Sequence, residues 1–384
     1  MISAKKITSV YGAQFQETRK KMAALGEEDP PVSSWHWKPF DPARIPPRNL
    51  MSPQQWPSAV QTNYRPSDKP QKVILLFEVD ALNAVLLNAL KRQKLKYFFV
   101  DYMQMMEQCG NIQMDLAGGF GSGFGLGQAQ LRFSDVAAVI WNPPFFDEDI
   151  PRHPIADHLF CNRWSQCLRD LRAFLPKKTI WLPSHPLNGS ADWQQKLSEY
   201  AYAREAGLHI PQTLCTNDPA AAKKFIDRWG GKVLFREFNS PYIFFRIAFA
   251  DAREKALKKL SSSPCVFQQY IKKEYEIRAV VVGDKIFACQ IDSQASELAK
   301  IDWRCYDNAH VRWDRMELPK SVQRAMLSLM KKLDLKWGSF DMIKSPDGNY
   351  YFLEVNRPGA SYWLLPFVGL DVAWEITSYL KRVL

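Results

Sequence analysis

The stretch Gly338–Gly359, GSFDMIKSPDGNYYFLEVNRPG, decides how the C-terminal part of this chain folds. Two apolar, aromatic-rich runs flank Pro346-Asp347-Gly348, and these three residue types are the ones that tight turns prefer. The pattern therefore predicts a β-hairpin whose two strands are joined by a short loop.

Acidic and amide side chains interrupt the strands of this hairpin. Glu354 and Asn356 are two residues apart, so a strand places both on one face. If Ser345 pairs with Tyr350, Asp341 lies directly opposite Glu354. Two facing carboxylates repel each other unless a cation lies between them, and an all-oxygen set of ligands suits Mg²⁺. The hairpin thus predicts a metal site, and a solvated face with acidic side chains is the alternative.

The composition limits the function classes. The chain has 384 residues, enough for two or three domains, and a formal net charge of +11. A basic excess favours an acidic partner, such as nucleic acid, an anionic membrane surface, nucleotide phosphates or an acidic peptide. The chain has no long Lys/Arg run and no aromatic-basic repeat, so we do not expect a dedicated nucleic-acid-binding protein.

Cysteine usage and hydropathy indicate the compartment. The seven cysteines are scattered and include no C-x-x-C pair, which argues against a disulfide framework and a zinc site. The N-terminus has no apolar signal-peptide core, and no run of about eighteen apolar residues occurs. These features predict a soluble cytoplasmic protein that does not bind a membrane.

Residues 1–70 differ from the rest. Ten of the 25 prolines fall between Pro30 and Pro70, and tryptophans lie among them. Dense proline excludes long helices and central strands, so we expect an extended N-terminal arm. Because disordered tails are poor in aromatic residues, we expect the arm to lie on the body or on a partner; a floppy extension is the alternative.

A small α/β unit follows, starting sharply at Lys72. Val73–Phe77 has the apolar run of a buried strand, Asp80–Lys94 has helical spacing, and Lys96–Val100 predicts a second strand. Strand, helix and strand in this order form a βαβ unit. The Gly-rich segment 118–127 is interpreted as a mobile loop, because no Gly-Lys-Ser/Thr follows it and no helix begins there.

After Ser184 the pattern alternates between helices and strands. Asp192–Ala206 predicts a helix that Gly207 ends, and Asn217 is expected to cap the next helix. Ser321–Leu333 predicts an amphipathic helix that leads to the hairpin. The expected strands are Gln212–Thr216, Lys232–Arg236, Phe267–Tyr270, Ile277–Val282 and Lys285–Ile291.

Four segments in this order resemble the ATP-grasp fold. They are Lys196, eleven residues before Gly207-Leu208-His209-Ile210-Pro211, then Phe267–Ile271, Tyr275–Gly283, and Asp341 with Glu354-Val355-Asn356. Within that superfamily the chain is most similar to the ATP-grasp ribosomal peptide maturases, which are the graspetide synthetases or microviridin-type ligases. That closer similarity is carried by Gln269-Tyr270-Ile271-Lys272, Glu276-Ile277-Arg278, Ile291-Asp292-Ser293-Gln294 and Asp302-Trp303-Arg304.

The resemblance implies a fold of mixed α/β and α+β class in three parts. Residues 1–70 would be the Pro/Trp-rich extension and residues 71–183 an N-terminal α/β (pre-ATP-grasp) domain. Residues 184–384 would be the ATP-grasp domain, with a small lid subdomain at about 212–268.

The resemblance also implies how ATP is held. Backbone groups of Gln269-Tyr270-Ile271 would bind adenine, and Glu276 would accept hydrogen bonds from the ribose hydroxyls. Lys196 and Arg236 would neutralise phosphate charge. Without the resemblance, each residue has an alternative interpretation. Lys196 could be a solvated lysine on a helix surface, and Glu276 could form an ion pair with Arg278.

Other residues would act on the reacting groups. Arg278 would face the γ-phosphoryl group, and Arg304 would contact phosphate or the substrate carboxylate, or else cap a strand. The hairpin residues would hold two Mg²⁺ ions; they are Asp341, Glu354 and Asn356.

The chemistry that the resemblance implies joins a carboxylate to a hydroxyl or an amine. A side-chain carboxylate of Asp or Glu in an acidic precursor peptide, which the enzyme recognises through a leader, takes the γ-phosphoryl group of ATP. A Ser or Thr hydroxyl, or a Lys amine, then displaces phosphate and leaves an ester or amide crosslink. The resemblance leaves room for a homodimer.

Three features depart from the superfamily pattern. Arg236 stands where a second phosphate-binding lysine is common, and the segment Phe238–Phe249 contains no glycine. Asn356 is followed by Arg357-Pro358, where the pattern usually has proline directly. The alternatives are therefore a ligase that joins an amino acid to a small molecule or a protein tail, and a catalytically silent nucleotide-binding scaffold.

Overall fold

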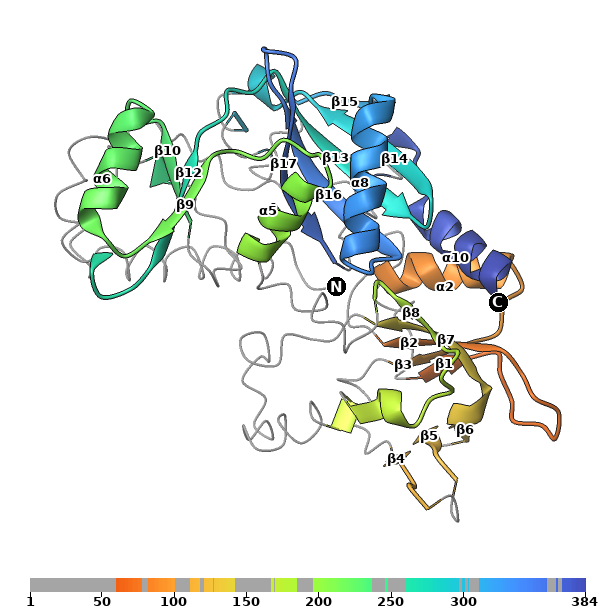
Figure 1. Cartoon of the computed structure of the whole chain (residues 1–384). Helices are drawn as coiled ribbons and strands as arrows, with labels where there is room; N and C mark the ends of the chain where they lie inside the picture. The colour runs from red at the N-terminus through yellow and green to blue at the C-terminus, as the bar shows by residue number, and fades with distance from the viewer. Residues whose placement is uncertain are drawn as a thin grey trace, which may run out of the picture.

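The computed structural model describes most of the chain from residue 60 onward (Figure 1). The described residues are 60–77, 82–100, 111–117, 121–126, 128–141, 167–168, 170–184, 196–236, 246–247, 260–296, 299–300, 303, 311–357, 364 and 368–384. Within these ranges the strands form four sheets. Residues 1–59 of the predicted arm, which was assigned to residues 1–70, lie outside the described residues.

The first sheet has the strand order β1-β3-β2-β7-β8. Its strands are β1 (Val60–Thr62), β2 (Val73–Phe77), β3 (Tyr97–Val100), β7 (Val136–Trp141) and β8 (Ile180–Leu182). Strands β2, β3, β7 and β8 are parallel, and helix α2 (Leu82–Arg92) connects β2 to β3. The predicted βαβ unit is confirmed, and its apolar runs are buried as a parallel sheet requires.

Strand β1 lies before the point where we expected order to begin. It pairs antiparallel with β3, so the sheet takes in three residues of the segment assigned to the N-terminal extension. Thr62 Oγ1 donates a hydrogen bond to Tyr97 O at 2.8 Å. A strand of three residues is too short for the alternation of side chains to reveal it in the sequence.

The Gly-rich segment is partly a strand, so the interpretation as a mobile loop is wrong for its second half. Strand β5 (Gly123–Leu126) lies between β4 (Asn111–Gln113) and β6 (Ala129–Arg132) in a three-stranded antiparallel sheet. A Cβ atom at position 123 would lie 2.2 Å from the backbone oxygen of Leu131. Glycine is therefore needed here for the close approach of two backbones and not for mobility.

We expect Gly123→Ala to destabilise this small sheet by about 1–3 kcal/mol, the usual effect of forcing an extra methyl group into a packed site. Gly125→Ala is the matched control, because there the new Cβ would meet only side-chain ends, Asn111 Oδ1 at 2.6 Å and Gln130 Nε2 at 2.7 Å. Thermal unfolding of both variants checks this. An equal melting temperature for the two would contradict the argument from backbone approach.

The second unit is a four-stranded antiparallel sheet with one helix. Its strand order is β11-β10-β12-β9, from β9 (Thr213–Thr216), β10 (Val233–Arg236), β11 (Arg246–Ile247) and β12 (Cys265–Gln269). Helix α6 (Pro219–Arg228) packs on it through Ala222 and Ile226. The cap of α6 is Asp218 and not Asn217 as predicted, because the Asp218 carboxylate accepts from Ala220 N at 2.8 Å.

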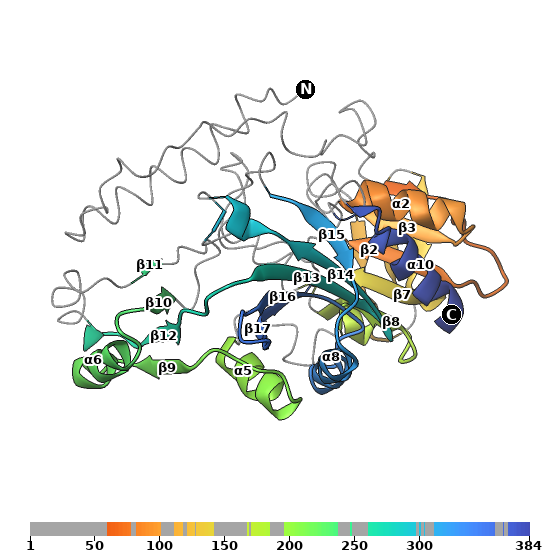
Figure 2. The same ribbon diagram turned by 90° about the horizontal axis from the view of Figure 1, so that it is seen from above.

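The largest sheet carries the opening hairpin. Its order is β15-β14-β13-β16-β17, from β13 (Tyr275–Val282), β14 (Lys285–Ile291), β15 (Trp313–Met316), β16 (Trp337–Lys344) and β17 (Tyr350–Asn356). Helices α5 (Lys196–Glu205) and α8 (Lys320–Lys332) lie side by side over one face of this central sheet (Figures 1 and 2). Gly207 ends α5 with a φ of +92°, as predicted.

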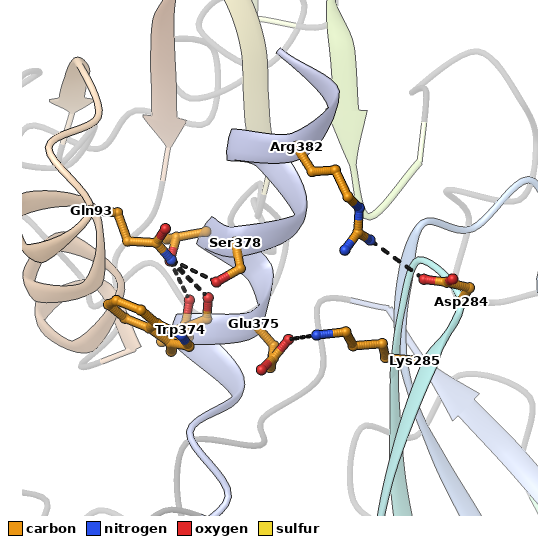
Figure 3. A network of polar contacts seen from close by, with 9 residues as sticks. Gln93, Asp284, Lys285, Trp374, Glu375, Ser378 and Arg382 are labelled. Atoms are coloured by element: carbon orange, nitrogen blue, oxygen red, sulfur yellow. Dashed lines mark hydrogen bonds and ion pairs between the residues drawn. The ribbon is translucent and has the colours of Figure 1, made fainter.

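The C-terminal helix α10 (Val372–Val383) joins the first sheet to the central sheet (Figure 3). Toward α2, Gln93 Nε2 donates to Trp374 O at 3.1 Å and to Ser378 Oγ at 2.7 Å. Toward the β13–β14 turn, Lys285 forms an ion pair with Glu375, and Arg382 forms one with Asp284. One buried core runs through both regions, so the segments predicted as 71–183 and 184–384 are packed together.

None of the helices in the described ranges has the length and apolar character that a bilayer span requires.

Candidate functional site

The hairpin strands meet in the register that sets Asp341 against Glu354. The reason differs from the predicted one, because Tyr350 pairs with Lys344 and not with Ser345. A β-bulge between Asp341 and Met342 restores the expected pairing from Glu354 onward. The prediction of two facing carboxylates is therefore confirmed, although the pairing from which we derived it is wrong by one residue.

The bulge also decides which side chains face which way. Phe352 and Val355 are three residues apart, yet both lie in the core beneath α5 and α8. A regular strand would put them on opposite faces, so the extra residue of the bulge is needed. Because neighbours alternate, Glu354 and Asn356 project from the other face of the sheet. Bulges are common beside active sites for this reason: they re-aim side chains.

Arg278 lies at the centre of that face. It pairs with Asp341 in the β13–β16 register, and its Nη1 lies 2.7 Å from Asp341 Oδ1 and 2.8 Å from Oδ2. Asn356 Nδ2 donates to Asp341 Oδ2 at 2.9 Å. The side chain of Arg278 is 6% exposed and that of Asp341 15% exposed. The structure thus brings together three of the predicted site residues in direct contact.

Glu276 lies two residues from Arg278 on the same strand and pairs with Lys273. The distance from Lys273 Nζ to Glu276 Oε1 is 2.9 Å, and both side chains are buried. The alternative interpretation was an ion pair between Glu276 and Arg278, whereas in the structure Glu276 pairs with Lys273 and Arg278 pairs with Asp341. Lys273 was not predicted as a site residue, although its position beside the hinge Gln269-Tyr270-Ile271 was an available signal.

The hinge connects β12 of the small sheet to β13 of the central sheet. Gln269 N donates to Gln212 O at 2.8 Å, and Tyr270 N donates to Lys232 O at 3.0 Å. Ile271 is buried, and within the described ranges its N–H has no backbone acceptor. Burial and the nearby charge of Glu276 raise the pKa of Tyr270, while Lys300 lowers it.

Three predicted site residues cannot be compared with the structure. The backbone places Lys196 at the start of α5 and Arg236 at the end of β10, opposite Val266 of β12. The side chains of Lys196 and Arg236, and all of Arg304, lie outside the described residues. Their predicted roles stay predictions.

Another buried charge pair lies at the end of β17. Glu199 of α5 and Arg357 have side chains that are 5% and 4% exposed, and Arg357 Nη2 lies 3.7 Å from Glu199 Oε2. In the sequence, Arg357 stands out only as a departure from the superfamily pattern, and Glu199 was not predicted as a site residue. A glutamate among the inward residues of α5, next to Tyr200, was the signal that could have found it.

The donor set of the hairpin suits a hard cation. Asp341, Glu354 and Asn356 supply carboxylate and amide oxygens, which Mg²⁺ prefers, and the set contains none of the Cys or His ligands that most zinc sites use. No cluster of three His, Cys, Asp or Glu side chains capable of holding a metal occurs in the described part of the chain. Any metal at the hairpin would therefore use the amide as well, and would complete its shell with water or with a substrate phosphate.

Several solved structures are similar to this chain in fold. No family model and no curated protein matches the chain. Among solved structures, the macrocyclase MdnC of Microcystis aeruginosa MRC, bound with precursor peptide MdnA, is 25% identical with a TM-score of 0.69 over 81% of this chain and 100% of that chain. A RiPP-associated ATP-grasp ligase of Chryseobacterium gregarium, in complex with ADP and a leader and core peptide, is 22% identical with a TM-score of 0.70, over 82% and 97% of the two chains.

A third similar structure is the ATP-grasp ligase PsnB, complexed with a minimal precursor, Mg and ADP. It is 19% identical, with a TM-score of 0.63 over 81% of this chain and 97% of that chain. These similarities show that the chain has the ATP-grasp fold over about four fifths of its length. The predicted fold and the resemblance to ATP-grasp peptide maturases are confirmed.

Proposed function

We propose that this ATP-grasp chain is a carboxylate ligase that crosslinks a ribosomally made precursor peptide. In this proposal it transfers the γ-phosphoryl group of ATP to Asp or Glu side chains of the peptide. A hydroxyl or an amine of the same peptide then displaces phosphate, which leaves an ester or an amide. The similar solved structures with bound precursor peptides and with ADP support this proposal.

The observation that carries the proposal is the acidic hairpin opposite Arg278. The carboxylates of Asp341 and Glu354 face each other across the hairpin, and the guanidinium of Arg278 on the neighbouring strand contacts that of Asp341. Burying this much charge is costly unless the charges are paired or a cation binds. Such an arrangement suits a site that receives Mg²⁺ and phosphate, and a mere scaffold would not need it.

ATP would lie between the small sheet and the central sheet. The hinge offers the backbone N–H of Ile271 and the hinge carbonyls to adenine, because Gln269 N and Tyr270 N already donate within the protein. Glu276, held by Lys273, would accept from the ribose hydroxyls. Lys196 and Arg236 would neutralise the phosphates.

The hairpin residues would hold Mg²⁺, two ions in our proposal. When bound, the metal would offset the negative charge of the phosphates during transfer. Asp341 and Glu354 would each supply carboxylate oxygens. Asn356 would supply its amide oxygen, because its nitrogen donates to Asp341.

Arg278 would act on the reacting phosphoryl group. In the structure its guanidinium forms an ion pair with Asp341. A metal bound to the Asp341 carboxylate would weaken this ion pair, so that the guanidinium could bind phosphate instead. Arg304 would orient the acceptor carboxylate. The first step forms a bond from a carboxylate oxygen to the γ-phosphorus and breaks the bond to ADP; the second forms the ester or amide and releases phosphate.

The proposed partner is an acidic peptide with a leader segment. The net charge of +11 favours such a partner through long-range attraction. A cytoplasmic location and a homodimer remain part of the proposal, as do the domain limits 71–183 and 184–384 and the lid at about 212–268.

A mass measurement tests the proposal directly. The protein is incubated with Mg²⁺, ATP and a short acidic peptide encoded beside its gene, and each new bond should remove the mass of one water from the peptide. A reaction with the non-hydrolysable analogue AMPPNP is the control and should leave the peptide unchanged. ADP release driven by a free amino acid alone would favour the small-molecule ligase, and absence of ADP with every acceptor would favour the silent scaffold.

A further inference from the structure

The outer edge of β17 is bound by the segment that contains α5. In the described part of the chain, β17 is the last strand of the central sheet, and its outer side has only an isolated parallel bridge between Tyr351 and His209. Phe352 N donates to His209 O at 2.8 Å, and Val355 N donates to Glu199 Oε1 at 2.8 Å. These two donors point outward although they are three residues apart, which only the bulge between them allows.

Glu199 uses both of its carboxylate oxygens at this edge. Oε1 accepts from the backbone of Val355, and Oε2 lies 3.7 Å from Arg357 Nη2. The whole residues are 4% exposed for Glu199 and 8% for Arg357, so water screens the pair little. The side chain of Glu199 in α5 therefore contacts both Val355 and Arg357 at the end of β17.

The two residues that Glu199 contacts alternate along the chain with the two candidate metal ligands of the same hairpin strand. Val355 lies between Glu354 and Asn356, and Arg357 follows directly. The bulge removes one regular ladder contact at this point, so the cross-strand pairing alone holds the strand end less firmly. An anchor at Val355 and Arg357 would limit the movement of Asn356, which lies between them, and of Glu354, which directly precedes Val355.

We propose that Glu199 is a positioning residue for the hairpin metal site, acting through Val355 and Arg357. This inference rests on the proposed function, because it assumes that Glu354 and Asn356 hold a cation. Position 196, the predicted phosphate lysine, lies one turn before Glu199 on α5. The same helix would thus set the distance between the phosphate-binding and metal-binding groups.

The test measures metal binding apart from catalysis. Mn²⁺ is titrated into the full-length protein with saturating ADP, and free Mn²⁺ is followed by its electron paramagnetic resonance signal. Glu199→Gln keeps an oxygen acceptor for Val355 N but removes the charge that holds Arg357. We expect its Mn²⁺ dissociation constant to rise about tenfold, the lower limit for losing an outer partner of a metal site.

Two further variants separate positioning from stability. Glu205→Gln changes a glutamate of the same helix that pairs with Lys332 at the surface, 2.9 Å away, and should leave Mn²⁺ binding unchanged. The double variant Glu199→Gln/Arg357→Gln removes both charges of this pair, so its melting temperature without metal should lie closer to the wild-type value than that of Glu199→Gln. Its Mn²⁺ affinity should nevertheless stay low. If Glu199→Gln does not fold, the Mn²⁺ affinity of the double variant tests the positioning role instead.

Wild-type Mn²⁺ affinity in Glu199→Gln, or its full recovery in the double variant, would overturn the proposal. So would a wild-type protein that binds no Mn²⁺ with ADP. Wild-type Mn²⁺ binding without any crosslinking of peptide would instead contradict the proposed function, while the positioning role would stand on the binding data.

Discussion

Glu354→Gln is expected to slow Mg²⁺-dependent ADP formation strongly while the protein stays folded. Glu354 is buried and faces Asp341 across the hairpin, and glutamine has nearly the same shape without the charge. Metal charge stabilises a transferring phosphoryl group by several kcal/mol, and about 1.4 kcal/mol corresponds to a factor of ten. We therefore expect kcat to fall about 100- to 1,000-fold in a coupled assay of ADP release.

Asp347→Asn in the turn of the same hairpin is the matched control. Asp347 Oδ1 accepts from Asn349 N at 3.0 Å, and an asparagine oxygen can still do so. A binding readout separates lost chemistry from lost structure: Mg²⁺ with ADP at about 100 times the dissociation constant should stabilise the wild type by about 2.7 kcal/mol. This thermal shift should be lost in Glu354→Gln and kept in Asp347→Asn. Wild-type turnover in Glu354→Gln would exclude Glu354 as a metal ligand.

The hairpin shows how much of the site the sequence could predict. Residue spacing placed Glu354 and Asn356 on one face, and that depended only on the alternation of a strand. The register was predicted through a Ser345–Tyr350 pair that the structure does not contain. A bulge is local and leaves no periodic signal, so spacing alone could not reveal it.

Ion pairs between residues that are distant in the chain could not be predicted from the sequence for a different reason. Glu199 and Arg357 are far apart in the chain, and their contact exists only after α5 packs on β17. The same holds for Arg278, whose strand position was predictable and whose contact with Asp341 depends on the β13–β16 register. Strand β1 was missed because three residues carry too little pattern, and β5 was missed because its two glycines interrupt the apolar run.

The sequence predicted most reliably the elements with several agreeing signals. Helix α5 was predicted from its spacing together with Gly207 at its end, and β13 and β14 from apolar runs around Gly283-Asp284. Where a single residue type is compatible with two structures, as glycine is with a loop and with closely packed strands, the prediction was wrong. The glycines in the segment 118–127 favour a mobile loop by composition, whereas in the structure Gly123 allows a close approach of two backbones.

Arg278→Met is expected to lower both the stability of the metal-free protein and the rate of phosphoryl transfer. Arg278 is buried and contacts both carboxylate oxygens of Asp341, which faces Glu354. Removing one member of a buried ion pair leaves a charge uncompensated, so we expect a loss of about 3–5 kcal/mol in the free energy of unfolding. Arginines that contact a transferring phosphoryl group contribute about 1,000-fold or more to kcat, so turnover should fall by at least that factor.

A second variant separates these two effects. In Arg278→Met/Asp341→Asn both charges are gone, so stability should recover in urea unfolding while turnover should stay low. Arg382→Met removes an exposed arginine that lies 3.4 Å from Asp284, and such surface pairs contribute only about 0–1 kcal/mol. If Arg278 served stability alone, the double variant would keep the turnover of Asp341→Asn by itself. If it acts on phosphate as proposed, the double variant should be slower than Asp341→Asn at equal stability, because the guanidinium is then missing from the transition state.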